Sequence, residues 1–476
     1  MRIARREFLQ AGLAAAAVGV CAPRRAFSQS DAALKERAHL PDEDPWLRAR
    51  ISGWGQLPGI LASIVPPQFP DVDFNIVDYG ASDAQGFNSS PAINAAIEAC
   101  NRQGGGRVVV PAGIWISNGP IRLLSNVNLF LEDGASITFG TNPNDYVPLQ
   151  LVRWQGVRCY NYSPLIHAYQ QKNIAVTGSG TFFGQAQVWN EWTPIQKPDA
   201  KALRLMAEDG VPLSKRLFGP GHFLRPGMFE PYECQNILVQ GVTFSDSPFW
   251  TMHPTFCTNV TIQEVSVTPG VYNDDGCDPD SCQNVLVEGC TFLTEDDNVS
   301  IKSGLLPDAA GLPPCENIVF QNCSLLRSAW SGLTIGSDVG SGVRNVFIEN
   351  CSVANSLNAH YIKAHENWGG YVENVYFRNS MVDTCRSMLA LIPDIYNEAG
   401  TAGPPSFSNI NIENVTVANS IGAPLVSQGD ARLAINGLNL ANIAVTSKAK
   451  KFGVVSNTVG ITATGLTLNG VPVSVT

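Results

Sequence analysis

A short pattern recurs along the chain: a polar turn, then an asparagine, then apolar residues in alternate positions. From Asn236 onward, successive copies begin 23, 25, 33, 28, 29, 35 and 27 residues apart. A period in this range is typical of a solenoid, in which each repeat packs only against its neighbours. The asparagines that begin the copies are Asn173, Asn236, Asn259, Asn284, Asn317, Asn345, Asn374, Asn409 and Asn436.

The repeat unit is expected to be a β-strand, because β-branched residues are frequent at the alternating apolar positions. A leucine-rich repeat is excluded because its leucine framework is missing. The pattern therefore predicts an all-β fold, a right-handed parallel β-helix of stacked coils. In such a stack each position recurs above its neighbour, so the asparagines are expected to form an amide ladder at a bend.

A solenoid must cover its exposed ends. Ser90 and Pro91 precede a stretch of helical periodicity, residues 92–102, and three glycines at 104–106 follow it. A serine cap, a proline in the first turn and a glycine past the end are typical helix boundaries. We therefore predict an N-terminal capping helix over the first coil.

The remaining residues divide into a few segments. Residues 29–73 are interpreted as an extended or partly helical lead-in, and residues 74–476 as a single β-helix domain. Residues 186–230 interrupt the repeats and are predicted to form a long insertion over one face. Such an insertion could act as a lid over that face.

The first 28 residues are typical of a twin-arginine signal peptide. Arg5 and Arg6 precede an apolar run, residues 11–22, and residues 26–28 offer a cleavage site. The apolar run is too short to span a bilayer as a permanent helix. The sequence therefore predicts a periplasmic or secreted protein that is not held in a membrane.

The chain has twelve cysteines, one of which, Cys21, lies in the predicted signal. An exported protein could form disulfides, but twin-arginine substrates fold in a reducing compartment before export. Several cysteines recur with the repeat, so we interpret most of them as small buried apolar residues. No cysteine pair or Cys/His cluster has the spacing of a zinc site, and we predict no metal and no cofactor.

The formal net charge is −10, and the first 28 residues contribute +4, so the remainder carries about −14. Binding to nucleic acid needs a basic surface, which excludes nucleic acid as a partner. An anionic glycan would also be repelled at long range, so a site for one must gather its cations locally.

The most informative acids lie in two short stretches, residues 273–278 and 295–297. Crowded carboxylates repel one another, and this raises the pKa of one of them. Asp275 and Asp296 are 21 residues apart, close to one coil, so neighbouring coils would place them side by side at roughly 4.8 Å. A protonated and an ionised carboxyl together suit glycoside hydrolysis. The alternative is an acidic ladder that is structural or binds a cation.

These two stretches resemble motifs of glycoside hydrolase family 28, the polygalacturonase family. The family pattern N-T-D-G-x-D is similar to residues 273–278, with Asp274 where the family has Thr. The pattern G-D-D-x-x-x-I-K-S-G is similar to residues 295–304, and weaker similarity extends from about Phe74 to Asn379.

The resemblance implies an inverting glycosidase that hydrolyses a pectic or related polysaccharide or oligosaccharide. It implies that Asp296 is the general acid and that Asp275 and Asp297 hold and activate the water. Inversion ordinarily places the acid and the base roughly 6.5–9.5 Å apart, with room for that water. The insertion at 186–230 could block one end of the groove, which would favour exo-action.

Two later motifs depart from the family pattern. G-H-G-x-x-x-G-S corresponds to residues 330–337, with Ser331 in place of the histidine, and R-I-K corresponds to residues 361–363, with Tyr361 in place of the arginine. An arginine fork holds a carboxylate bidentately and a tyrosine cannot. These changes support an alternative substrate, a rhamnose-containing or neutral-sugar linkage.

The candidate substrate-binding residues surround these motifs. His360 and His365 flank Lys363 and would supply charge or hydrogen bonds, unless they are ordinary turn histidines. Trp330 and Trp368 are either sugar-stacking platforms or wall filler. The predicted substrate-binding set is Lys363, Tyr361, His360, Asn273, Lys302, Ser331, Trp330 and Asp274.

Three further alternatives remain. Asp274 and Glu295 replace uncharged family residues, and they either point outward or contact sugar hydroxyls. A polysaccharide lyase on the same fold would use a base and a calcium site, which the acids could form. A non-catalytic glycan-binding solenoid would bind the same glycans without turnover.

Overall fold

The computed structural model describes residues 53–393 and 400–476. The predicted signal peptide and most of the predicted lead-in, up to residue 52, lie outside the described residues. Leu57–Thr476 form one compact unit, which begins with helix α4 (Leu57–Ser63) and strand β1 (Asp73–Asn75). None of the helices described is long and apolar enough to cross a membrane.

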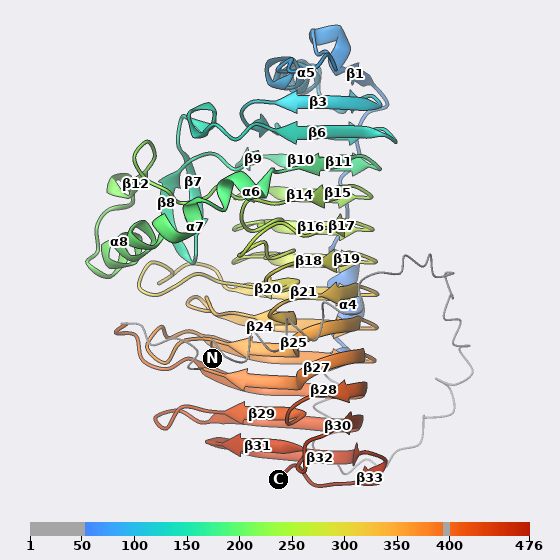
Figure 1. The fold of residues 1–476 in the computed structure, drawn as a ribbon, viewed down its shortest axis with the longest axis vertical. Helices are drawn as coiled ribbons and strands as arrows, with labels where there is room; N and C mark the ends of the chain where they lie inside the picture. Colours follow the sequence, from blue (N-terminus) through green and yellow to red (C-terminus); the bar gives the residue numbers. More distant parts are fainter. Residues whose placement is uncertain (1–52, 394–399) are drawn as a thin grey trace. The chain divides into compact units, whose positions relative to one another are not determined.

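The compact unit is a parallel β-helix, and the predicted fold class is confirmed. Its coils are stacked so that strands from successive repeats pair in parallel, as Figure 1 shows. Val260, for example, is paired with Val285, and Val285 with Ile318. These valines and isoleucines point inward and are fully buried or nearly so, because alternate residues of a strand face opposite sides.

Three stacks of strands make up the coils, and the longest strands bend from one stack into the next. The first stack continues from β1 through β2 (Gly106–Val110), β5 (Val127–Leu131), β10 (Lys172–Gly178), β14 (Gln235–Gln240), β16 (Thr258–Gln263), β18 (Gln283–Glu288), β21 (Cys315–Gln321), β24 (Val343–Glu349), β26 (Tyr371–Arg378), β28 (Ser406–Ser420), β30 (Ile435–Ser447) and β32 (Thr458–Leu468). The second contains β3 (Gly113–Ser117), β6 (Ala135–Phe139), β11 (Thr181–Phe183), β15 (Thr243–Ser245), β17 (Ser266–Val267), β19 (Thr291–Leu293) and β22 (Ser324–Arg327).

The third stack carries the acidic motifs. It contains β4 (Ile121–Arg122), β9 (Ile166–Tyr169), β13 (Phe229–Tyr232), β20 (Val299–Ile301), β23 (Ser331–Ile335), β25 (Ser352–Lys363), β27 (Met381–Ile392), β29 (Leu425–Gln428) and β31 (Gly453–Ser456). Single bridges at Met252 and Cys277 continue it between β13 and β20. The short antiparallel strand β33 (Val471–Pro472) follows the last coil.

The predicted asparagine ladder is present. Asn317 donates to Asn284 at 2.9 Å and Asn345 donates to Asn317 at 3.2 Å, and the same link recurs in most other coils. These asparagines have φ between 52° and 59°, a left-handed conformation that asparagine tolerates better than most residues. The predicted asparagine of the last copy, Asn436, is one residue too early. In the structure Gly437, with φ of 77°, occupies the bend position.

The cysteines pack as predicted. All eleven cysteines from Cys100 to Cys385 are buried and none of them forms a disulfide. Cys257 donates its thiol to the carbonyl of Pro231 at 3.2 Å, and Cys282 contacts Pro254 in the same way. Recurrent cysteines therefore fill an inward slot as small, weakly donating side chains.

The predicted capping helix is α5 (Ser90–Arg102), with Pro91 in its first turn. Its buried stripe, which includes Ile93, Ile97 and Cys100, belongs to the main hydrophobic core. The described residues also form short 3₁₀ helices at η1 (Ile76–Tyr79) and η2 (Pro143–Tyr146).

A lateral subdomain, defined here as residues 150–161 and 186–224, projects from the side of the coils (Figure 1). Its sheet joins β7 (Gln150–Trp154), β8 (Val157–Asn161) and β12 (Leu217–Phe218). Its helical elements are α6 (Ala186–Trp189), α7 (Trp192–Ile195), α8 (Lys197–Glu208) and η3 (Leu213–Lys215). The predicted insertion at 186–230 thus shares its sheet with an earlier hairpin, and the chain has returned to the coil at β13.

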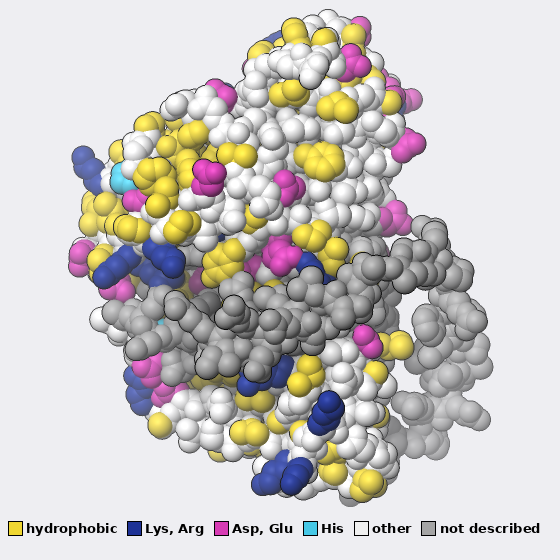
Figure 2. Space-filling view, viewed as in Figure 1, with side chains coloured by type: hydrophobic (Ala, Val, Ile, Leu, Met, Phe, Trp, Pro, Cys, Tyr) yellow, Lys and Arg dark blue, Asp and Glu magenta, His cyan; other side chains and the backbone are white. Residues whose placement is uncertain are grey.

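The lateral subdomain has a hydrophobic core of its own. This cluster includes Leu203 and Phe218, and it reaches the β-helix at Trp250, Leu305 and Trp368. On the face shown in Figure 2, the described Lys and Arg side chains are interspersed with Asp and Glu rather than gathered in a stripe.

Candidate active site

The three aspartates of the acidic motifs meet on adjacent coils of the third stack. One carboxylate oxygen from each of Asp275, Asp296 and Asp297 lies within 4.8 Å of the others. All three side chains are buried. The turn that holds Asp275 fits tightly on the next coil, since a Cβ on Gly276 would come within 2.5 Å of the carbonyl oxygen of Asn298. This close stacking brings acids from two sequence stretches into one cluster.

Two lysines compensate two of the three acids. Lys302 Nζ donates to Asp275 Oδ2 at 3.3 Å and to Ser300 Oγ at 2.7 Å. Lys363 Nζ donates to Asp297 Oδ2 at 2.6 Å. An ammonium at this distance favours the ionised form of its carboxyl partner. Asp275 and Asp297 therefore each have an ammonium partner within hydrogen-bond distance.

Asp296 occupies a different electrostatic environment. Burial, followed by repulsion from Asp275 and Asp297, raises the pKa of Asp296 well above its usual value. Burial also raises the pKa of Asp275, but Lys302 opposes this shift. Two carboxyls with opposed environments are the usual basis of an acid and a base in one site. The arrangement can donate one proton from Asp296 and accept another at Asp275 or Asp297.

The acids are closer together than the spacing of about 6.5–9.5 Å that inversion ordinarily uses, because their nearest oxygens lie within 4.8 Å. This nearest-oxygen distance is shorter than the separation expected for the carboxyl groups. Carboxyl separation alone does not predict inversion in this protein.

Asp274 points into the protein. It is 1% exposed, and it accepts hydrogen bonds from the backbone N–H of Gly270 at 2.7 Å and of Glu295 and Asp296 at 2.9 Å. Neither oxygen is presented to a sugar, so Asp274 belongs to the support of the site. Glu295 forms an ion pair with Arg327 at the partly exposed rim.

Asn273 is held by Arg225, an arginine that no sequence motif marks. Arg225 is fully buried, and its Nη2 donates to Asn273 Oδ1 at 2.9 Å. It also donates to Gln196 Oε1 at 3.0 Å and to the carbonyl of Tyr272 at 2.8 Å. Burial lowers the pKa of Arg225 to about 10. Arg225 thus ties the segment that contains α7 and α8 to the acidic turn.

His360 does not line the site, and its predicted substrate-binding role is wrong. The ring is fully buried, lies 4.6 Å from the ring of Phe377, and places Nδ1 3.0 Å from the carbonyl of Met388. Burial lowers its pKa to about 4. Alternation along β25 instead places Tyr361 and Lys363 on one side, and Lys363 Nζ lies 5.5 Å from the Tyr361 ring centre.

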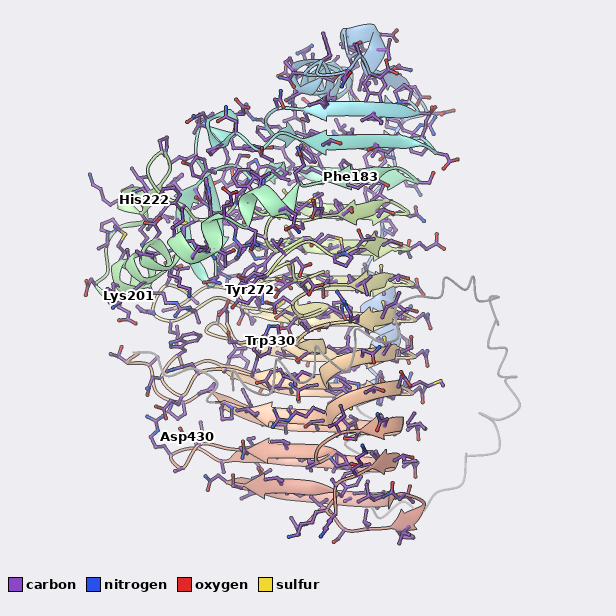
Figure 3. The ribbon with its side chains drawn as sticks, viewed as in Figure 1. Phe183, Lys201, His222, Tyr272, Trp330 and Asp430 are labelled. Carbon is purple, nitrogen blue, oxygen red and sulfur yellow. The ribbon has the colours of Figure 1, made fainter. Side chains whose placement is uncertain are left out.

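Ser331 and Trp330 lie at the start of β23, beside the loop that holds Asp296. Ser331 is fully buried, and its Oγ accepts from Asn358 Nδ2 at 3.4 Å. Trp330, labelled in Figure 3, is half-buried, and its backbone N–H donates to Ser328 Oγ, which donates to the carbonyl of Asp296 at 2.6 Å. Ser331 therefore faces the interior, whereas Trp330 is partly exposed near the loop that holds Asp296.

Trp368 and His365 form part of the wall where the lateral subdomain meets the coils. Their rings stack at 4.7 Å, and the guanidinium of Arg204 from α8 lies 4.9 Å from the Trp368 ring. Trp368 is 4% exposed and belongs to the core of the lateral subdomain. Its position favours the wall-filling interpretation over a sugar platform.

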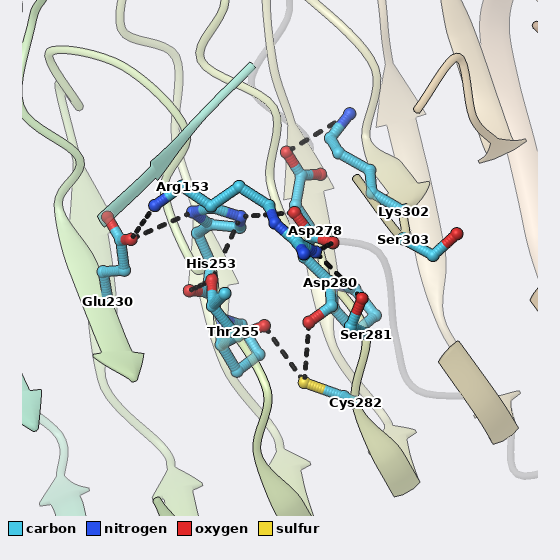
Figure 4. A network of polar contacts seen from close by, with 12 residues as sticks. Arg153, Glu230, His253, Thr255, Asp278, Asp280, Ser281, Cys282, Lys302 and Ser303 are labelled. Atoms are coloured by element: carbon cyan, nitrogen blue, oxygen red, sulfur yellow. Dashed lines mark hydrogen bonds and ion pairs between the residues drawn. The ribbon is translucent and has the colours of Figure 1, made fainter. Parts of the chain in front are cut away.

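A buried network of charges lies beneath Lys302 (Figure 4). Asp280 accepts from Arg153 Nη1 at 2.6 Å and contacts His253 Nε2 at 3.3 Å, while Glu230 lies 3.7 Å from His253 Nδ1. Burial alone would lower the pKa of His253, but Glu230 and Asp280 outweigh it and raise the pKa to about 10. The rings of His253 and Trp250 meet in a T-shaped arrangement with centres 4.8 Å apart, and Lys302 Nζ lies over the Trp250 ring, 4.4 Å from its centre.

The fold and the cluster of acids define a polygalacturonase-like glycoside hydrolase, and sequence comparison agrees. Residues 224–462 match Glycosyl hydrolases family 28. The chain belongs to this family, as its motifs indicated, and the prediction that it is a glycoside hydrolase is confirmed. This membership favours hydrolysis over the lyase and non-catalytic alternatives.

Several proteins named as polygalacturonases are similar to the chain. It is 32% identical to a hyperthermoactive exopolygalacturonase from Thermotoga maritima, whose structure matches with a TM-score of 0.81 over 88% of this chain and 96% of that one. It is 24% identical over 396 residues to a probable polygalacturonase of Vitis vinifera, covering 79% of this chain and 75% of the relative. It is 25% identical over 375 residues to an endo-polygalacturonase of Pectobacterium carotovorum subsp. carotovorum, covering 76% of this chain and 85% of the relative.

Proposed function

We propose that the protein is an exported, inverting exo-polygalacturonase that hydrolyses the galacturonate linkages of pectic chains. The observation that carries this proposal is the distribution of charge in the acidic cluster. Asp275 and Asp297 each contact a lysine, whereas burial and two neighbouring acids favour the protonated form of Asp296. One acid and two bases in contact distance supply the groups that glycoside hydrolysis needs.

In the proposed mechanism Asp296 donates its proton to the glycosidic oxygen as the bond from that oxygen to the anomeric carbon breaks. Asp275 and Asp297 hold a water molecule on the opposite face of the sugar. The water attacks the anomeric carbon and loses its proton to one of these carboxylates. Lys302 and Lys363 place a positive charge against the two carboxylates before the step.

We propose that Lys363 binds the galacturonate carboxylate in place of the arginine of the family pattern, where this chain has Tyr361. Lys363 donates to Asp297, and its Nζ lies 5.5 Å from the centre of the Tyr361 ring. A single ammonium attracts a carboxylate without the bidentate fit of a guanidinium. The alternative substrate, a rhamnose-containing or neutral-sugar linkage, is supported by Tyr361 and Ser331, which replace the arginine and the histidine of the family pattern.

A substrate panel separates these alternatives. We expect hydrolysis of polygalacturonate and little turnover of the same polymer after reduction of its carboxyl groups. Faster turnover of the reduced polymer or of rhamnogalacturonan would favour the alternative linkage. An unsaturated product that absorbs in the ultraviolet and disappears with chelator would instead identify a lyase.

The exo-action proposal rests on the attachment of the lateral subdomain. Asp308, in the loop that follows β20 and Lys302, accepts from Arg158 Nε at 3.0 Å and from Arg216 Nη1 at 2.5 Å. In the same loop, the backbone N–H of Leu305 donates to the carbonyl of Gly156 at 2.8 Å. These contacts support a lateral subdomain that acts as a fixed wall beside the acids rather than as a lid that opens.

Asp308→Ala is expected to loosen this wall and shift the products. The change removes the acceptor of two arginines from a side chain that is 7% exposed. We expect the wild type to release single sugar units, and the variant to lower polygalacturonate viscosity several-fold more for each bond cleaved. Viscometry with chromatographic product analysis provides the measurement.

Glu316→Ala is the matched control, because Glu316 forms a partly exposed ion pair with Arg344. It should leave the product pattern unchanged. The wall proposal fails if Asp308→Ala makes the lateral subdomain sensitive to protease while single sugars remain the only product.

The export proposal rests on the N-terminal sequence alone. Replacing Arg5 and Arg6 together with lysine is expected to retain the protein in the cytoplasm of its bacterial host. Unchanged export of the variant would contradict a twin-arginine route.

A further inference from the structure

Asp274 is the point at which the acidic turn departs from the family pattern, and its contacts give the departure a role. We propose that Asp274 is a positioning residue for the general acid: it fixes the backbone of Asp296 and extends to higher pH the range over which Asp296 keeps its proton. This inference rests on the proposed function, because it takes Asp296 to be the general acid.

The geometry of Asp274 spans two coils. Its Oδ1 accepts from the N–H of Glu295 and of Asp296, both at 2.9 Å, and its Oδ2 accepts from Gly270 N–H at 2.7 Å. A threonine, the family residue, has one hydroxyl oxygen and cannot offer this pair of acceptors. Oδ1 therefore links the turn of Asp274 to the loop that carries the general acid, while Oδ2 anchors the same carboxylate to its own turn.

The charge of Asp274 also acts on Asp296. The charged groups that face Asp296 are Asp275, Asp297, Lys363 and Asp274, and Arg225 approaches from the segment after the lateral helices. Of these, Lys363 favours the ionised form of Asp296, whereas the three aspartates favour the protonated form. Asp274 is the one among them that no lysine contacts among the described residues.

Asp274 itself is affected by its surroundings. Burial raises the pKa of Asp274 to about 7, although its three backbone N–H partners favour the ionised form. As pH rises through this value Asp274 becomes charged, and the new charge raises the pKa of Asp296. A general acid is active while protonated, so activity falls as pH rises through its pKa. The alkaline limb of activity is thereby moved to higher pH.

Asp274→Asn tests the proposal, since the amide keeps one oxygen for Glu295 and Asp296 but carries no charge. We expect the alkaline limb of kcat/KM to move to lower pH by about one unit, the size of effect that a nearby like charge has in a protein of effective dielectric constant about 20. Asp274→Thr, the family residue, should show the same shift. The readout is the full pH profile of kcat/KM, with the melting temperature measured beside it.

Asp246→Asn is the matched control, because Asp246 also accepts a backbone N–H, from Ala186 at 3.1 Å, but is not among the charges that act on Asp296. The pH profile of kcat/KM for Asp246→Asn should match that of the wild type. An unmoved limb in Asp274→Asn and Asp274→Thr, with or without a lower melting temperature, would overturn the proposal, and so would loss of folded protein in both. Failure of the general-acid assignment is recognised separately, by an active Asp296→Asn enzyme.

Discussion

Asp296→Asn is expected to lower kcat on polygalacturonate by about 10³- to 10⁴-fold, which is the upper part of the range for general acid catalysis. The amide cannot donate the proton that the leaving oxygen needs. It can still accept a backbone hydrogen bond in the place where Asp296 Oδ1 accepts from Asp297 at 2.9 Å. The fold should therefore survive, and the melting temperature should change little. Initial rates of reducing-sugar release provide the measurement.

Asp383→Asn is the control for this variant, because Asp383 is exposed on β27. It should retain wild-type activity. A drop of less than tenfold in Asp296→Asn would show that Asp296 is not the general acid.

Lys302→Met is expected to damage both activity and stability. The ammonium is 3.3 Å from Asp275 and 3.7 Å from Asp278, and all three side chains are buried. Removing one partner of a buried ion pair ordinarily costs about 3–5 kcal/mol of unfolding free energy. Chemical denaturation should show a loss of this size.

The same variant should also change the pH profile. Lys302 opposes the rise in the pKa of Asp275 that burial causes, so without Lys302 this pKa rises further. A base is active while ionised, and activity is lost as pH falls through its pKa. The acidic limb of kcat/KM should therefore move to higher pH, and activity at neutral pH should fall by about 10²-fold.

Lys172→Met is a suitable comparison, since Lys172 is an exposed lysine of β10. This variant should leave the free energy of unfolding and the pH profile of kcat/KM unchanged. A normal acidic limb in folded Lys302→Met would contradict the role of Lys302 in keeping Asp275 ionised.

The coil architecture could be predicted from the sequence because one period repeats through most of the chain. The same logic brings Asp275 and Asp296 together, since their spacing is close to one coil. The substrate-binding role predicted for His360 was wrong, although the alternation of the strand already indicated that its side chain faces inward. Residues two apart in a strand share a face, so a site that contains Tyr361 and Lys363 turns His360 inward.

Other residues of the site could not be predicted, because they do not belong to the repeating pattern. Arg225 and Arg153 are single arginines outside any motif, and each reaches its partner from residues far away in the sequence. His253 depends on two carboxylates, Glu230 and Asp280, that lie in different coils. Such contacts follow from the path of the lateral subdomain, which local patterns do not encode.

Product stereochemistry is the most direct test of the central claim, because the short separation of the acids does not itself predict inversion. Proton NMR in the first minutes of polygalacturonate hydrolysis reports the anomer before mutarotation. The linkage is α, so attack by a water held at Asp275 and Asp297 gives the β anomer first. Initial appearance of the α anomer would contradict the roles assigned to all three aspartates.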